Sequence, residues 1–193
     1  MDQRAWRLER TLAYHCAPSL SGVKPADLIS WRESGTGDGP LLCRYIRLLA
    51  GQGVRLRVLN RRGGRCLLLV YRPELLRRCL AQPAVAGMLA RAGYPGEMEG
   101  QLRMLASRLG RAEFPHEVGL FLGYPPEDVA GFQREGGRNC KLVGPWKVYG
   151  PVEEAVRRFR LFGRCREQLC RGLDEGNSLL QMLAAALAAS RAR

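Results

Sequence analysis

Hydrophobic residues recur at helical spacing near both ends of the chain. Apolar positions three or four residues apart predict a helix over residues 2–16, a long helix beginning at Pro151 and a last helix over residues 178–190. A further helix is expected over residues 41–51, after a glycine-rich turn. These segments predict a largely helical framework.

Three other segments have the patterns of β-strands. In residues 54–71, a segment of alternating polar and apolar residues is followed by a glycine turn and then by an apolar run. This order predicts a β-hairpin. Residues 118–123 are apolar and uncharged, as in a buried strand, and residues 141–149 alternate again. In such a strand Lys141 and Lys147 share one face.

The order of these elements predicts the fold class. Short helices separated by proline and glycine are expected at residues 73–81, 83–92, 98–110 and 125–135. We expect a single compact α+β domain over residues 1–193, with a small mixed sheet that includes the hairpin and a C-terminal β-α-β-α unit. Residues 1–110 hold the N-terminal helices and the hairpin, and residues 111–193 hold the β-α-β-α unit.

Length and composition narrow the class of protein. The chain has 193 residues, of which 46% are hydrophobic, enough to form a core. No apolar run reaches the roughly 18 to 20 residues that a membrane-spanning helix needs. The seven cysteines show no paired spacing, which favours a reducing compartment, the cytoplasm. No ligand spacing predicts a metal site, and no motif identifies a cofactor.

The basic charge is almost entirely arginine. Lysine and arginine together number 31 against 18 acidic residues, for a net charge of +13, yet only Lys24, Lys141 and Lys147 are lysine. An arginine-rich composition is typical of GC-rich coding sequences wherever either cation serves on a solvated surface. The three lysines therefore mark positions where a compact ammonium group is expected to matter.

Arginine is densest in the predicted hairpin. Between residues 55 and 78 the only acid is Glu74, and the alternation places Arg55 and Arg57 on one strand face. This segment is a candidate nucleic-acid interface, although no aromatic residues interleave with the arginines. The alternative is a basic surface with no partner. The candidate residues of the interface are Arg55, Arg57, Arg61, Arg62 and Arg65.

Two parts of the sequence resemble a known family. Residues 114–125 read FPHEVGLFLGYP, and EDV, GF and WKVYG follow at residues 127–129, 131–132 and 146–150. Near the N-terminus the chain has HCAP at residues 15–18, then Gly22 and Lys24-Pro25. Together these resemble a family of uncharacterised bacterial proteins, mostly clostridial, known only as a domain of unknown function. The resemblance covers nearly the whole chain and implies no activity.

The motif contains the residues best suited to chemistry. His116 beside Glu117 could serve as a general acid or base, or hold a structural role in the core. Lys24, Lys141 and Lys147, with Tyr149 as a donor, would suit an anionic small molecule. Binding of such a ligand is the leading hypothesis, and whether the protein is an enzyme stays open.

Other classes of function remain as alternatives. The first is nucleic-acid binding through the hairpin, and the second is a metal-linked or redox-linked accessory protein. The third is an assembly module, in which the leucine stripe of the last helix forms a homodimer through residues 177–190.

Overall fold

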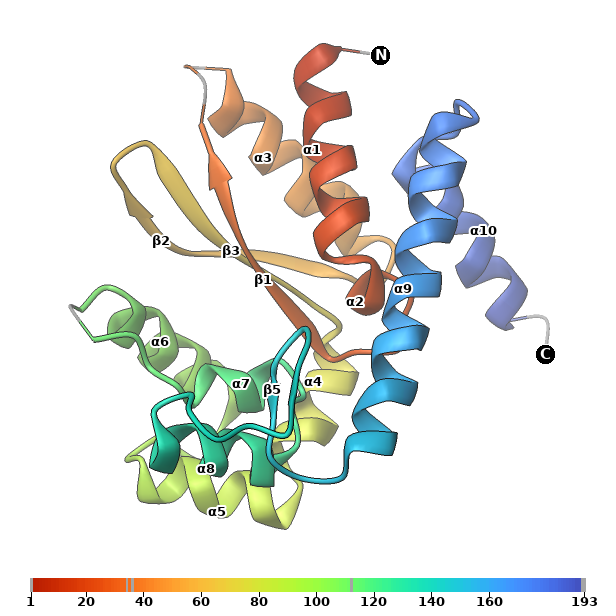
Figure 1. The fold of residues 1–193 in the computed structure, drawn as a ribbon. Coiled ribbons are helices and arrows are strands. Elements are labelled where there is room, and N and C mark those ends of the chain that lie inside the picture. Colours follow the sequence, from red (N-terminus) through yellow and green to blue (C-terminus); the bar gives the residue numbers. More distant parts are fainter. Residues whose placement is uncertain (1, 34, 36, 112, 192–193) are drawn as a thin grey trace. The chain divides into compact units, whose positions relative to one another are not determined.

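The computed structural model confirms the expected α+β class (Figure 1). The structure describes residues 2–33, 35, 37–111 and 113–191. Contacts along the chain group it into two compact units, which are described separately. Unit 1 comprises Met1–Pro73 and Phe162–Arg193, and unit 2 comprises Glu74–Leu161. That the whole chain acts as a single domain stays a prediction.

Unit 1 is built on a three-stranded sheet. The strand order is β1-β3-β2 and both pairings are antiparallel, so the predicted hairpin is confirmed as β2 and β3. The sheet contains no parallel pair, which corrects the expectation of a mixed sheet. Unit 1 contains the helices α1 (Gln3–His15), α2 (Ala17–Leu20) and α3 (Asp38–Ala50), and the strands β1 (Ala26–Arg32), β2 (Arg55–Arg62) and β3 (Arg65–Tyr71).

Helices α1 and α3 lie on one face of this sheet (Figure 1). The strand register places Ile29 and Val58 on either side of Leu68, and Leu56 beside Val70, all on the helix-covered face. Trp31 shares that face, and the guanidinium of Arg7 in α1 lies 4.5 Å from its ring centroid. The hydrophobic core of unit 1 therefore lies between this sheet face and the helices.

The two C-terminal helices, α9 (Val152–Asp174) and α10 (Leu179–Arg191), form where the sequence predicts them. Leu179 and Leu183 of α10 are buried within the chain. The backbone N–H of Leu179 donates to Glu9 Oε2 at 2.8 Å, which gives the first turn of α10 an acceptor from α1. Part of the leucine stripe thus packs on unit 1, and a homodimer through residues 177–190 stays a prediction.

Unit 2 consists of short helices and one small hairpin. Helix α4 follows directly on the sheet of unit 1, and the first part of α9 completes the unit. Its elements are α4 (Pro73–Leu80), α5 (Pro83–Arg91), α6 (Met98–Leu109), α7 (Val118–Phe121), α8 (Pro126–Glu135), β4 (Leu142–Val143) and β5 (Lys147–Val148).

The apolar segment at residues 118–123 is a helical turn, α7, and the predicted strand is wrong. The backbone N–H of Leu122 donates to Val118 O at 3.1 Å, and Gly123 adopts a φ of +73° that ends the turn. Val118, Leu120 and Phe121 are all buried. A segment that is buried on every side has no polar face, so its periodicity cannot distinguish a helix from a strand.

Residues 141–149 form a hairpin, which corrects the prediction of one continuous strand. Val143 pairs with Lys147 across the turn, and the backbone N–H of Gly144 donates to Trp146 O at 3.1 Å. Pro145 at the turn has no N–H to contribute to a ladder. The order in this region is therefore α-α-β-β-α, and the expected β-α-β-α unit is absent.

Candidate functional site

The motif residues of unit 2 surround a pocket of about 350 Å³. Four segments contribute to it: the loop before α7, the α7–α8 connection, α8 itself and the β4–β5 hairpin. Most of the lining is apolar or aromatic. The lining residues are Phe114, His116, Val118, Gly119, Tyr124, Asp128, Val129, Phe132, Val143, Gly144, Pro145, Trp146 and Lys147.

His116 and Lys147 bring polar chemistry to this pocket. His116 is exposed, and its ring meets the Phe132 ring edge-on, with centroids 4.9 Å apart. Lys147 Nζ lies 5.9 Å from the same Phe132 centroid and donates to Gly137 O at 2.5 Å. Both groups thus contact one aromatic ring, and one N–H of the ammonium has a protein acceptor. The other two N–H bonds of Lys147 have no acceptor among the described residues.

Asp128 holds the walls of the pocket together. Its side chain is buried, and its Oδ2 accepts from Trp146 Nε1 at 2.6 Å. Its Oδ1 accepts from the backbone N–H groups of Tyr149 and Gly150, both at 2.7 Å. One carboxylate in the first turn of α8 therefore fixes the end of the β4–β5 hairpin. The sequence marks Asp128 only as part of the EDV segment, near the start of the helix expected over residues 125–135.

The aromatic wall is built around Trp146. Its ring stacks on Tyr124, with centroids 4.8 Å apart and planes 25° apart, and meets Phe159 of α9 edge-on at 4.6 Å. The Tyr124 hydroxyl donates to Pro145 O at 3.3 Å. Stacking at this hairpin is thus provided by Tyr124, between α7 and α8, and by Phe159 of α9.

Glu117 does not line this pocket. It accepts a hydrogen bond from the Tyr94 hydroxyl at 3.1 Å and forms an ion pair with Arg108. Burial alone would raise the pKa of Glu117, but its own backbone N–H, Arg108 and Tyr94 donate to it and hold that pKa below its ordinary value. The carboxylate is therefore ionised near neutral pH and paired with Arg108 and Tyr94. Through Arg108 it connects α6 to the loop before α7.

The four predicted ligand-binding residues are not brought to one site. Lys147 lines the pocket, whereas Lys141 is exposed and donates to Gly150 O at 3.2 Å from the opposite strand. The Tyr149 ring packs against Gly131 of α8, where a Cβ would lie 2.4 Å from Tyr149 Cγ. Lys24 belongs to unit 1 and is buried, with Nζ 2.5 Å from Asp27 Oδ1.

The Tyr149 hydroxyl has its own environment outside the pocket. It is buried, and no acceptor or donor lies within hydrogen-bond distance among the described residues. Burial raises the pKa of Tyr149, and the neighbouring Cys140 and Glu135 add to that effect. The phenol is therefore neutral at physiological pH, as a hydrogen-bond donor must be.

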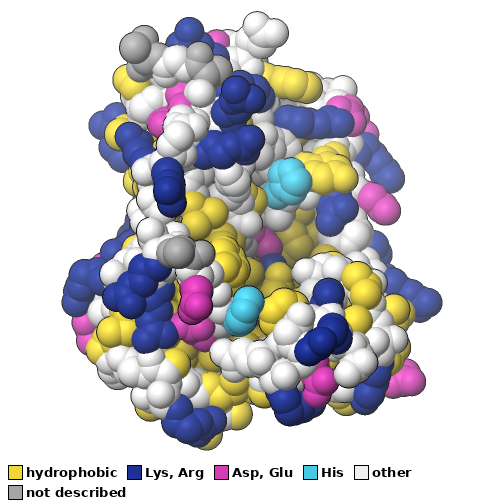
Figure 2. Space-filling model, turned by 60° about the vertical axis from the view of Figure 1, so that its left-hand side comes forward, with side chains coloured by type: hydrophobic (Ala, Val, Ile, Leu, Met, Phe, Trp, Pro, Cys, Tyr) yellow, Lys and Arg dark blue, Asp and Glu magenta, His cyan; other side chains and the backbone are white. Residues whose placement is uncertain are grey.

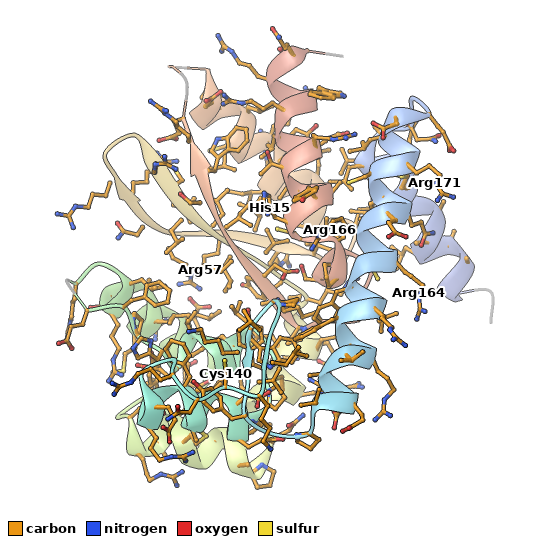
Figure 3. All side chains as sticks on the ribbon, in the orientation of Figure 1. His15, Arg57, Cys140, Arg164, Arg166 and Arg171 are labelled. Carbon is orange, nitrogen blue, oxygen red and sulfur yellow. The ribbon has the colours of Figure 1, made fainter. Side chains whose placement is uncertain are left out.

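The arginines of the hairpin lie mostly on one side of the unit 1 sheet. A β-bulge between Val58 and Asn60 shifts the alternation by one residue. As a result, Arg62 shares a face with Arg55 and Arg57, whereas Arg61 turns to the helix-covered face, with Nη2 3.8 Å from Glu33 Oε1. Figure 3 shows Arg57 on the side of the sheet away from α1 and α3.

Cations are otherwise widely distributed. Figure 2 shows lysine and arginine side chains scattered over the visible face, with few acids among them.

Within the described ranges, no three histidine, cysteine or acidic side chains gather closely enough to hold a metal ion. No helix of the described chain is long and apolar enough to cross a membrane. All seven cysteines are free.

Comparison with known proteins identifies a family but no characterised relative. No curated protein matches the chain, and no solved structure matches it. A family described as "Protein of unknown function (DUF3793)" matches residues 12–183, a range that includes both the N-terminal motif and the pocket. The chain belongs to the DUF3793 family.

Proposed function

We propose that the pocket of unit 2 binds a small anionic ligand with an apolar, flat body. The convergence of the motif on one pocket of about 350 Å³ carries the proposal, because the segments that resemble the family meet there. That volume falls in the range of small-molecule sites, which are mostly apolar with a few polar groups that orient the ligand.

The walls and the charges of the pocket suit different parts of such a ligand. The Tyr124 and Trp146 rings and Phe132 offer aromatic surface for a planar group. Lys147 offers an ammonium with two unused N–H donors, and His116 offers a second donor against the same Phe132 ring. An acid placed beside Phe132 would contact both groups, which favours an aromatic carboxylate or phosphate.

The cytoplasm is the compartment that we propose for this activity, as the cysteine pattern predicts. We propose binding and no reaction, because Glu117 already pairs with Arg108 and Tyr94. It is therefore not available as an acid or base beside His116. Any proton transfer to a bound ligand would rest on His116 alone.

The test measures thermal stabilisation by defined probes. Phenyl phosphate and 3-phenylpropionate are added to the purified chain, with benzyl alcohol as the uncharged counterpart. We expect the two anions to raise the midpoint of thermal unfolding in a saturable way and benzyl alcohol to have a weaker effect. Equal effects of charged and uncharged probes, or no effect of any, would contradict the proposal.

Two lysines of the same hairpin supply a matched pair of variants. Lys147→Met removes the ammonium from the pocket, and Lys141→Met removes one that donates to Gly150 O outside it. We expect Lys147→Met to weaken binding of phenyl phosphate at least tenfold and Lys141→Met to leave it within about twofold. Lys147→Arg should also weaken binding, because Lys147 Nζ already lies close to Gly137, where a Cβ would be 2.9 Å from it, and a guanidinium is larger than an ammonium.

A further inference from the structure

The face of the unit 1 sheet opposite α1 and α3 carries a row of arginines that the pocket does not use. Ala26, Leu69 and Tyr71 at one end of this face are buried, and the exposed arginines Arg32, Arg62 and Arg65 lie at the other end. Opposite the helix-covered face, the strand register aligns Arg32 of β1, Arg65 of β3 and Arg62 of β2 side by side across the sheet. Arg55 and Arg57 continue the same face along β2. We call these five residues the basic face. Arg32 joins it only through the pairing of β1 with β3.

No acid interrupts this face. The sequence contains no aspartate or glutamate between residues 39 and 73, and the outward residues of β1 are Ala26, Leu28, Ser30 and Arg32. Arg32, Arg55, Arg62 and Arg65 are exposed, and none of them forms an ion pair with a described residue. Like charges directly opposite one another on neighbouring strands destabilise a sheet. A bound polyanion would remove that cost.

We propose that the basic face binds the phosphate backbone of nucleic acid without sequence preference. Neighbouring strands lie about 4.8 Å apart, so the exposed Arg32, Arg65 and Arg62 can contact neighbouring phosphates together. Guanidinium groups pair with phosphate oxygens through two parallel N–H donors. Beyond the β-bulge, Asn60 and Arg62 continue this face, and Arg62 lies opposite Arg65.

The chemistry of the face favours duplex over single-stranded nucleic acid. Binding of single strands relies on exposed aromatic side chains that stack on bases. The aromatic residue that the register places on this face, Tyr71, is buried. An anionic membrane is disfavoured for a related reason, because none of the exposed large hydrophobic side chains of the described residues lies on this face.

The test is fluorescence anisotropy with a fluorescein-labelled 20-base-pair DNA duplex, titrated from 50 to 300 mM salt. Phosphate contacts from the four exposed arginines, Arg32, Arg55, Arg62 and Arg65, predict that the logarithm of affinity falls with the logarithm of salt with a slope of about −3.6. We expect the quadruple variant Arg32→Gln, Arg55→Gln, Arg62→Gln, Arg65→Gln to bind more than tenfold more weakly at 100 mM salt, with a slope smaller by about 3.6.

A control of equal charge separates a specific face from general attraction. The quadruple variant Arg44→Gln, Arg47→Gln, Arg164→Gln, Arg171→Gln removes four exposed arginines from the helices α3 and α9. Figure 3 shows Arg164 and Arg171 projecting from α9 away from the sheet. We expect this variant to bind the duplex within about twofold of the parent chain. Equal losses in both quadruple variants would overturn the proposal.

Further measurements complete the test. Circular dichroism confirms that each variant is folded, and replacing the four face arginines by lysine should retain most of the affinity, since the charge remains. The single strand should bind more weakly than the duplex. Tighter binding to vesicles containing phosphatidylserine than to the duplex would reject nucleic acid as the partner. Lys147→Met should not change duplex binding, so this proposal and the proposed pocket fail independently.

Discussion

At the scale of single residues, the Arg108–Glu117–Tyr94 cluster predicts how stability depends on pH. The pKa of Glu117 is lower in the folded chain than its ordinary value of about 4.3, so its stabilising effect is present above that pH. It is lost as the pH falls through the lower, folded value. The free energy of unfolding therefore rises with pH in this range, because the unfolded state binds the proton more readily than the folded state.

We expect Glu117→Gln to lower the free energy of unfolding at pH 7 by about 2 kcal/mol, since a carboxylate with charged hydrogen-bond partners is lost. Urea titrations at pH 7 and pH 3.5 should show a smaller difference between variant and parent at the lower pH. Glu113→Gln, which changes an exposed carboxylate nearby, serves as the control. An equal loss of stability at both pH values would exclude ionisation of Glu117 as the cause.

Asp128 gives a second prediction for a single residue. Asp128→Ala leaves three donors without an acceptor, namely Trp146 Nε1 and the N–H groups of Tyr149 and Gly150. We expect a loss of about 3 kcal/mol in urea titrations and a change in the fluorescence of Trp146. Asp128→Asn keeps one oxygen for the two backbone donors but presents an amide to Trp146, so an intermediate loss is expected. Full stability of Asp128→Ala would contradict this role.

At the scale of elements, close packing of α8 on the β4–β5 hairpin depends on Gly131. A Cβ there would lie 2.4 Å from Tyr149 Cγ. Because Cγ joins the ring to Cβ, rotation of the ring does not move it away. Alanine at Gly131 should therefore destabilise the chain by about 1 to 2 kcal/mol, despite its better helix propensity. Gly163 of α9 has open space where a Cβ would lie, so Gly163→Ala should stabilise by up to about 1 kcal/mol. Urea unfolding of both variants measures the change in the free energy of unfolding, which should be negative for Gly131→Ala and positive for Gly163→Ala.

Elements with a clear periodicity were predictable from the sequence, and those without it were not. Helix α1 follows its apolar stripe because it has one buried and one exposed face. The β2–β3 hairpin was marked by an alternating segment, a glycine turn and an apolar run, and β3 is buried on both faces. Helix α7 has no exposed face, and the alternation over residues 141–149 continues across the turn at Gly144 and Pro145. Neither pattern contains the information that decides between the alternatives.

The candidate site was predictable in the same partial way. The rarity of lysine pointed to Lys147, and the motif at residues 114–125 pointed to His116; both residues line the pocket. Asp128 was missed because its partners lie 18 to 22 residues away, with no local spacing to mark them. Arg32 was missed because only the pairing of β1 with β3 places it beside Arg65.

At the scale of the whole molecule, the prediction of a single domain can be tested through α9. This helix runs unbroken from Val152 to Asp174, and the boundary between the two units falls within it, between Leu161 and Phe162. Unfolding one unit alone would require the helix to break in its interior, where each residue lost also removes a hydrogen bond. We therefore expect the two units to unfold together.

Hydrogen exchange followed by mass spectrometry can measure this coupling. Gly131→Ala is a change within unit 2, whereas the amides of β3 belong to unit 1. If the chain unfolds as one domain, the variant should lower the opening free energy of the slowest amides in β3 and in α8 by the same amount. Gly163→Ala, a change within unit 1, should raise both by the same amount. Protection of β3 that ignores Gly131→Ala while α8 loses protection would show two independent domains, because a perturbation is transmitted only within a cooperative unit.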